Sequence, residues 1–209
     1  ETNLQTSRFY DRHPEYLIGA EGAQGWSGSL AEVLPFFQDF AHAEVRALRM
    51  DIAVEACRRY PISGFLYDYM RCPGYFKRGE EEAGAEIMTQ FMRDTRRALD
   101  EVGAERGQPV GLAVRVPTTI DGSMRLGLDA AAWIGEGLVD LVVPSCFFAQ
   151  DMEEDVGEWV ELAKGTPVQI YPSIEEGYRA GHASGFRRWY LNPPLMTPLT
   201  NEMIRGLAA

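Results

Sequence analysis

The sequence has few of the side chains that most often hold metals. It contains three histidines and three cysteines, and neither set shows the HExxH or CxxC spacing of a metal or redox site. Such sites need their ligands close together. The sequence therefore predicts that the chain holds no metal centre, and that Cys57, Cys72 and Cys146 are small buried hydrophobic residues.

Several nucleotide-binding and hydrolase motifs are also missing. The chain has no GxGxxG and no GxxxxGK[ST], so no nucleotide cofactor is expected. Ser145 does not lie in a GxSxG turn, which disfavours a serine hydrolase. The only lysines are Lys77 and Lys164, and neither ends a predicted strand. Chemistry that depends on a lysine or a bound cofactor is therefore disfavoured.

Long apolar runs and excess positive charge are absent as well. No run approaches the ~18 apolar residues of a membrane span, so no membrane segment is expected. The formal charge of −11 disfavours nucleic acid as a partner, because that binding depends on Lys and Arg neutralising phosphates. The chain begins at Glu1 without a signal-peptide pattern. The sequence therefore does not decide between a secreted, a periplasmic and a cytoplasmic location.

What the sequence does contain is an alternation of short apolar runs with longer helical ones. This alternation is typical of α/β folds with a parallel sheet, and 209 residues fit one domain. The predicted strands are 36–40, 64–69, 110–116, 138–144 and 168–171, and the predicted helices are 43–60, 85–102, 129–135, 156–163 and one from about 201. The apolar strands predict that both faces of the sheet are covered. The charged run 77–82 is predicted to be a solvated loop.

Charged and aromatic side chains follow the predicted strands. Because loops at the carboxyl ends of parallel strands carry the reactive groups in such folds, these side chains are candidates for one shared site. In chain order they are Asp39 with His42, Asp68 with Arg71, Arg115, Ser145, and Tyr171 followed by Glu175 and Glu176.

Asp68 is the leading catalytic candidate, and its role stays open. Partial desolvation by Tyr67, Tyr69 and Tyr75 would favour the protonated form that a general acid needs. A nearby arginine would favour the ionised form of a nucleophile or an electrostatic anchor. Asp68 could equally cap the following loop or pair with Arg71.

The other candidates also have two interpretations. An arginine within a parallel strand needs a polar cavity or a partner, so Arg115 either binds substrate or pairs with Asp68 or Asp39. His42 either begins the following helix or donates a hydrogen bond in the cleft. Glu175 or Glu176 is expected to be the second carboxylate. The many aromatic residues near the expected cleft favour a neutral carbohydrate ligand over a phosphate.

Five stretches of the chain are similar to a known family. They are "SRFYDRHPEYLIG", "QDFAHAEVRALRMDIAVEACRRYPISGFLYDYMR", "GLAVRVPTTI", "GLVDLVVPSCFF" and "VQIYPSIEEGYRAGHASGFRRWYLNPP". Together they resemble the bacterial glycosyl-hydrolase-like family 10 proteins, which are (β/α)8 barrels. The resemblance spans nearly the whole chain.

This resemblance implies a single (β/α)8 TIM-type barrel domain over residues 1–209. About five parallel strands are too few to close such a barrel, so the first two strands and the last one would be missing, and other segments or an oligomer would complete it. It also implies that Asp68 ends strand four and Tyr171 strand seven. Related glycosidases often carry a glutamate after an asparagine at the end of strand four, and this chain has Asp68 there instead.

The leading functional prediction is a glycoside hydrolase that acts on a poly- or oligosaccharide with two carboxylates. Asp68 would work with Glu175 or Glu176, while Asp39, Arg71, Arg115, Tyr171 and His42 would bind the substrate. Two alternatives stay open. One is a carbohydrate-binding barrel without catalysis, and the other is a barrel sugar lyase or isomerase.

Overall fold

The computed structural model describes residues 8–24, 34–70, 73–146 and 155–174, and two short strands beyond them. Its helical elements are α1 (Arg8–Arg12), η1 (Pro14–Tyr16), α2 (Gly19–Gly22), η2 (Leu34–Phe36), α4 (Ala43–Arg59), α5 (Glu81–Arg106), α6 (Ile120–Met124), α7 (Ala130–Gly135) and α8 (Gly157–Ala163). Its strands are β1 (Gly64–Asp68), β2 (Gly111–Pro117), β3 (Leu141–Ser145), β4 (Gln169–Ile170), β5 (Gly177–Arg179) and β6 (Met196–Pro198).

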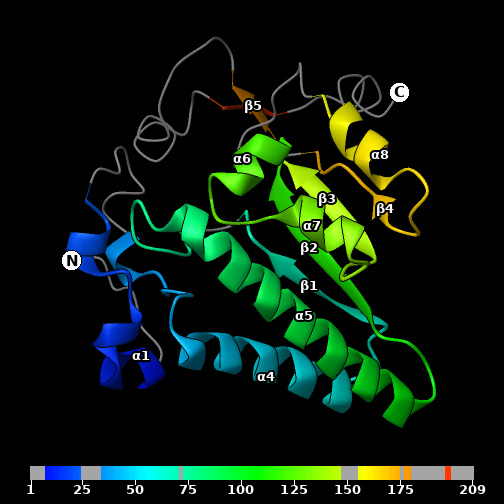
Figure 1. Ribbon diagram of the computed structural model, residues 1–209, viewed down its shortest axis with the longest axis horizontal. Helices are drawn as coiled ribbons and strands as arrows, with labels where there is room; N and C mark the ends of the chain where they lie inside the picture. The colour runs from blue at the N-terminus through cyan, green and yellow to red at the C-terminus, as the bar shows by residue number, and fades with distance from the viewer. Residues whose placement is uncertain are drawn as a thin grey trace.

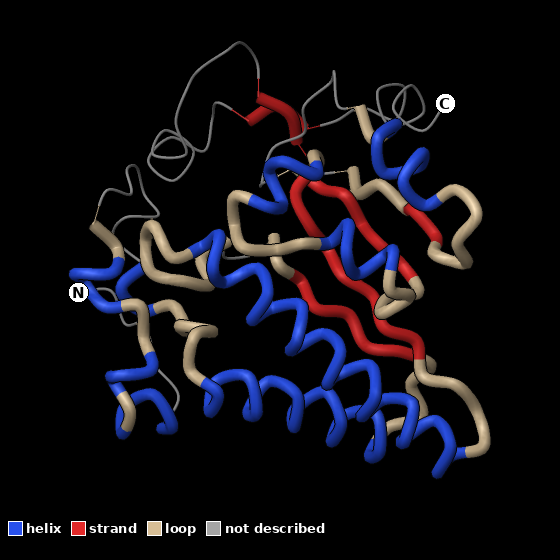
Figure 2. Tube along the Cα trace, viewed as in Figure 1, coloured by secondary structure: helices blue, strands red, loops and turns tan. Residues whose placement is uncertain are grey.

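The first four strands form one parallel sheet in the order β1-β2-β3-β4 (Figures 1 and 2). At least one helix lies between consecutive strands of this sheet, which confirms the predicted α/β fold. β5 and β6 form a separate antiparallel pair. The sheet is open in the described part of the chain, with β1 at one edge and β4 at the other.

The predicted strand 36–40 is wrong. Its first residue ends η2, and its pairing is limited to one antiparallel bridge between Leu17 and Gln38. The carboxylate of Asp39 accepts a hydrogen bond from the N–H of Ala41 at 2.9 Å, which turns the chain toward α4. The four-stranded parallel sheet is therefore one strand smaller than the sequence predicted.

The helix α5 shows how the sequence builds the helical layer. Met88, Met92 and Leu99 recur at helical spacing, and each is fully buried. The helix begins at Glu81, so the last two residues of the predicted loop 77–82 are helical. They are glutamates, and carboxylates in the first turn of a helix stabilise its dipole. The helix ends at Arg106, and the next residue, Gly107, has a φ of +70°, which lies in the left-handed region that favours glycine.

Helices cover one face of the sheet. Figure 1 shows α4 and α5 side by side and α7 in front of β2 and β3. Successive residues of a strand point to opposite faces. On β2, Leu112, Val114 and Val116 point to the helices and are fully buried, whereas Ala113 and Arg115 point away and are half-buried. Both faces were predicted to be covered, and in the described residues the second face is not.

The uncovered face carries an apolar row that crosses three strands. Leu66, Ala113 and Leu141 lie opposite one another in the register, and Gln169 continues the row on β4. Leu66 is 44% exposed although it is apolar. Among the residues that the structure describes, no helix combines the length and the apolar character that a bilayer crossing requires.

Candidate functional site

A polar cluster lies on the uncovered face where the strands end. Asp68 is the last residue of β1, and it lies opposite Arg115 of β2 in the parallel register. Their side chains therefore leave the same face of the sheet. The Nη1 of Arg115 is 3.3 Å from Oδ2 of Asp68, while Oδ1 accepts the N–H of Met70 at 2.9 Å. Arg115 was predicted either to bind substrate or to pair with Asp68 or Asp39, and the structure contains the pair with Asp68.

Ser145 holds the other side of the guanidinium. It ends β3, and its Oγ accepts hydrogen bonds from Nε of Arg115 at 3.0 Å and from Nη2 at 2.7 Å. The same hydroxyl donates to the carbonyl of Cys146 at 2.9 Å, and Ser145 is fully buried. Arg115 is thus fixed between a carboxylate and a hydroxyl, which orients it over the strand ends.

Asp68 keeps access to solvent within this cluster. Its side chain is 36% exposed, and that of Arg115 is 22% exposed. Tyr171, which follows β4, is 60% exposed, and its N–H donates to the carbonyl of Val142 at 3.0 Å. A polar ligand can therefore reach Asp68, and Tyr171 offers an exposed aromatic ring at the same carboxyl end of the parallel strands.

Asp39 and His42 form a different group. Asp39 is 1% exposed, and its Oδ2 lies 3.6 Å from Nζ of Lys77 and 3.9 Å from Nε2 of His42. The His42 ring lies 5.2 Å from the ring of Tyr16. His42 is the residue before α4, in agreement with its interpretation as the beginning of the helix. The structure therefore gives Asp39 a cationic neighbour, Lys77, that the sequence did not indicate.

Three predicted site residues lie outside the described residues: Arg71, Glu175 and Glu176. In the described part of the chain, no group of three or more His, Cys, Asp or Glu side chains is placed to hold a metal ion. Of the three predicted catalytic carboxylates, Asp68 is the one whose position the structure describes.

Two of the tyrosines that were predicted to desolvate Asp68 pack toward the helices instead. Tyr67 leaves the opposite face of β1, and Tyr69, the residue after the strand, also packs against the helical layer. The hydroxyl of Tyr67 donates to the carbonyl of Arg49 on α4 at 3.3 Å, and the ring of Tyr69 lies 5.8 Å from that of Trp133 on α7. Burial raises the pKa of Tyr67 to about 12 and raises the pKa of Tyr69 as well. These two residues therefore join β1 to the helices.

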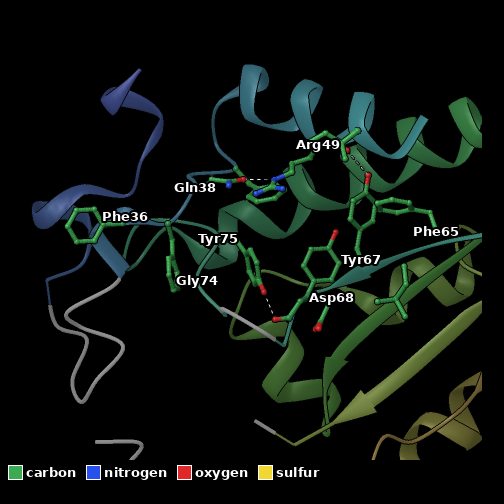
Figure 3. Close-up of a pocket in the computed structure, with 13 residues that line it drawn as sticks. Phe36, Gln38, Arg49, Phe65, Tyr67, Asp68, Gly74 and Tyr75 are labelled. Atoms are coloured by element: carbon green, nitrogen blue, oxygen red, sulfur yellow. Dashed lines mark hydrogen bonds between the residues drawn. The ribbon is translucent and has the colours of Figure 1, made fainter. Parts of the chain in front are cut away.

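A cavity of about 430 Å³ lies along the edge of β1 that faces away from β2 (Figure 3). Its lining includes the five consecutive residues 65–69, the side chains of Phe36 and Gln38, and Arg49 and Ile52 of α4. Nε of Arg49 donates to Oε1 of Gln38 at 2.5 Å across one end of the cavity. No local pattern in the sequence predicts this cavity, because its walls come from segments far apart in the chain.

No protein-family model matches the sequence, and no curated protein matches it. The resemblance to the glycosyl-hydrolase-like family 10 proteins stays a prediction.

The role of Ser145 can be tested by stability. Ser145→Ala removes the acceptor of two Arg115 hydrogen bonds, so we expect it to lower the free energy of unfolding by about 1–3 kcal/mol. Ser63→Ala, at an exposed serine before β1, should change it by less than about 0.5 kcal/mol. Urea unfolding measures both, and equal effects of the two substitutions would contradict the role assigned to Ser145.

The desolvated hydroxyl of Tyr67 predicts a loss of stability at alkaline pH. The pKa of Tyr67 is about 12 in the folded protein and 10.0 ordinarily. Below pH 10 both states keep the proton, and as the pH rises from 10 to 12 only the unfolded state loses it. Stability should therefore fall over this range, by up to about 2–3 kcal/mol for this group.

Variants separate this effect from general alkaline unfolding. Tyr67→Phe should flatten the fall in stability between pH 10 and 12, as measured by urea unfolding at each pH. Tyr60→Phe, at an exposed ring, should leave the fall unchanged. An undiminished fall in the Tyr67→Phe protein would show that desolvation does not raise the pKa of Tyr67 as described.

Proposed function

We propose that this protein is a glycoside hydrolase in which Asp68 is one of two catalytic carboxylates. The observation that carries the proposal is the placement of Asp68 at the carboxyl end of a parallel strand, accessible to solvent and held by Arg115 and the N–H of Met70. Active sites of parallel α/β folds lie at the carboxyl ends of the strands.

The surroundings of Asp68 suit a neutral, hydroxyl-rich ligand. The ion pair with Arg115 leaves no net charge in the described cluster, and the whole chain carries a formal charge of −11. An anionic ligand would meet this negative charge, whereas sugar hydroxyls can donate to the carboxylate and accept from the guanidinium. The exposed ring of Tyr171 is available for packing against a sugar face.

Hydrolysis requires a second carboxylate. Glu175 and Glu176 follow β4 in the sequence, and one of them is the proposed partner. In a two-carboxylate mechanism one group protonates the leaving oxygen while the other, ionised, attacks the sugar or activates water. Asp68, as the partner of Arg115, suits the ionised role, so the glutamate would be the general acid. A separation of ~5–5.5 Å would give retention and ~6.5–9.5 Å inversion.

The fold that we propose for the intact protein is the (β/α)8 barrel. The open parallel sheet supports it, because its helices lie on one face and its other face carries the apolar row of Leu66, Ala113 and Leu141. In a closed barrel this second face is the packed interior. Additional strands would then cover Leu66, which is exposed here.

A second candidate function is carbohydrate binding without catalysis. The specific observation in its favour is that the described neighbours of the Asp68 carboxylate are a guanidinium and a main-chain N–H, and not another carboxylate. Such a site can bind hydroxyl groups but lacks the second group that bond cleavage needs.

One experiment separates the two functions. The full-length protein and its Asp68→Asn variant would be screened for hydrolysis of a polysaccharide panel, with binding followed by affinity electrophoresis. We expect the variant to lose at least about 100-fold in hydrolysis, because it removes a catalytic group. Asp121→Asn, at an exposed aspartate on α6, should retain full activity.

Glu175→Gln and Glu176→Gln identify the second carboxylate, since only one of them should abolish hydrolysis. Hydrolysis that is unchanged in Asp68→Asn removes Asp68 from the mechanism. Binding that Asp68→Asn weakens, with no hydrolysis by the unchanged protein, supports the second candidate function.

A further inference from the structure

A buried carboxylate outside the Asp68 cluster has one oxygen without a hydrogen bond. Asp39 is 1% exposed, and its Oδ1 accepts the N–H of Ala41. Its Oδ2 has no hydrogen-bond partner among the described residues, because Nζ of Lys77 at 3.6 Å and Nε2 of His42 at 3.9 Å are too distant. Buried polar atoms of native proteins rarely stay unpaired. One further oxygen atom can bridge gaps of this size by ordinary hydrogen bonds.

The position of Lys77 in this group is fixed by its surroundings. The N–H of the next residue, Arg78, donates to the carbonyl of Gly22 at 2.7 Å. The aliphatic stem of Lys77 lies so close to Gly22 that a side chain at position 22 would overlap it. The Lys77 side chain is nevertheless 40% exposed and that of His42 is 32% exposed. Both donor groups are therefore accessible to a ligand.

Aromatic rings lie directly beside these donors. The ring of Tyr16 is 5.2 Å from that of His42, and it stacks on the ring of His13 at 5.0 Å and on that of Phe9 at 5.6 Å. Tyr16, His13 and Phe9 are half-buried, so part of the stack faces solvent. A few polar groups beside apolar and aromatic surface are typical of ligand sites.

The charges of the group favour a neutral ligand. The charges of Asp39 and Lys77 cancel. Burial, followed by the charges of Glu44 and Glu15, raises the pKa of Tyr16, so two carboxylates act on this ring. An anion would meet their negative charge. A hydroxyl group, in contrast, can accept from the ammonium of Lys77 and donate to the carboxylate of Asp39 at once.

Tyr75 joins this group to the Asp68 cluster. Its carbonyl accepts the N–H of Phe40, the residue after Asp39, at 2.8 Å. Its hydroxyl donates to the carbonyl of Tyr69, the residue after Asp68 (Figure 3). One tyrosine residue therefore spans the distance between the residues that follow the two carboxylates. A ligand of several sugar units is long enough to contact both groups.

We propose that Asp39, Lys77, His42 and Tyr16 form a second sugar-binding subsite, and that the substrate is an oligosaccharide of several units that reaches from this subsite to Asp68. A small displacement of the exposed Lys77 ammonium admits one sugar hydroxyl, which donates to Oδ2 of Asp39 and accepts from Nζ of Lys77. None of the four residues belongs to a strand of the parallel sheet, so the subsite does not require an open edge of β1.

The inference rests on the proposed function for the reaction at Asp68, whereas the subsite itself needs only a carbohydrate ligand. Asp39 and His42 were predicted to bind substrate, and the structure adds Lys77 and Tyr16 to them. Contacts so far from the cleaved bond hold the substrate and its transition state equally well. They therefore lower KM and leave kcat unchanged.

The lysine signals in NMR spectra test this proposal, because this chain contains only two lysines. The full-length protein, labelled with 13C-lysine, is titrated in turn with the hexasaccharides of cellulose, amylose, xylan, mannan and chitin. We expect one of them to shift the Cε signal of Lys77. The signal of Lys164, which pairs with Glu161, should stay unchanged. Lys77→Met and Lys164→Met assign the two signals.

Kinetics of the same variants separate binding from chemistry. Lys77→Met removes a hydrogen-bond donor, so KM for the bound hexasaccharide, or Kd without hydrolysis, should rise by about threefold to tenfold. We expect kcat, and KM for the corresponding disaccharide, to stay within about twofold. Lys164→Met is the matched control and should change none of these values. Asp39→Asn/Lys77→Met removes both charges together, and it provides the same test if Lys77→Met leaves Asp39 unpaired and does not fold.

Failure of this inference differs from failure of the proposed function. Hydrolysis of a hexasaccharide with an unmoved Lys77 signal and an unchanged KM in Lys77→Met overturns the subsite and leaves the hydrolase. A Lys77 shift without hydrolysis contradicts the hydrolase and supports the subsite. Equal shifts of Lys77 and Lys164, or no shift with any of the hexasaccharides, overturn the subsite. A fall in kcat at unchanged KM in Lys77→Met also overturns it, because Lys77 would then act in the chemical step.

Discussion

The parallel register between β1 and β2 is the constraint on which the candidate site depends. It places Asp68 opposite Arg115, so that both side chains leave the face of the sheet that no described helix covers. The next pairing brings Ser145 of β3 to the same guanidinium. A shift of either strand by one residue would send one of these side chains into the helical layer. Burying Arg115 there without a partner would be costly, and this cost favours the observed register.

The sequence was sufficient to predict the four parallel strands and four of the helices, whereas the short helix α6 between β2 and β3 was not predicted. Continuous apolar runs and helical spacing are local signals, and they place β1 through β4 and the helices α4, α5, α7 and α8 within a few residues of their observed bounds. The predicted strand at 36–40 failed for a nonlocal reason. Its pairing partner is Leu17, and the side chain of Asp39 turns the chain before a longer strand can form.

The candidate site was predictable only in part. An arginine within an apolar strand indicates a buried partner, and Asp68 was among the partners predicted for Arg115. The role of Ser145 as the acceptor of its guanidinium was not predicted, since only the order of strands in the sheet brings β2 beside β3. Lys77 and Asp39 are distant in sequence, so no local pattern indicated their proximity.

The polar cluster and the cavity use different parts of the same strand. The side chain of Asp68 contributes to the cluster on the uncovered face, and residues 65–69 line the cavity at the edge of the strand. Both features follow from the position of β1 at the edge of the sheet in the described residues. The apolar row on the uncovered face has the same origin, because it would be interior if the sheet continued.

The most direct test of the account is a double-mutant cycle on Asp68 and Arg115, measured as the free energy of unfolding. Asp68→Asn and Arg115→Gln, alone and together, give the coupling between the two side chains. Because the pair is partly exposed, the account predicts a favourable coupling of about 0.5–1 kcal/mol that shrinks at high salt. A coupling of zero at low salt would contradict the placement of these two residues side by side.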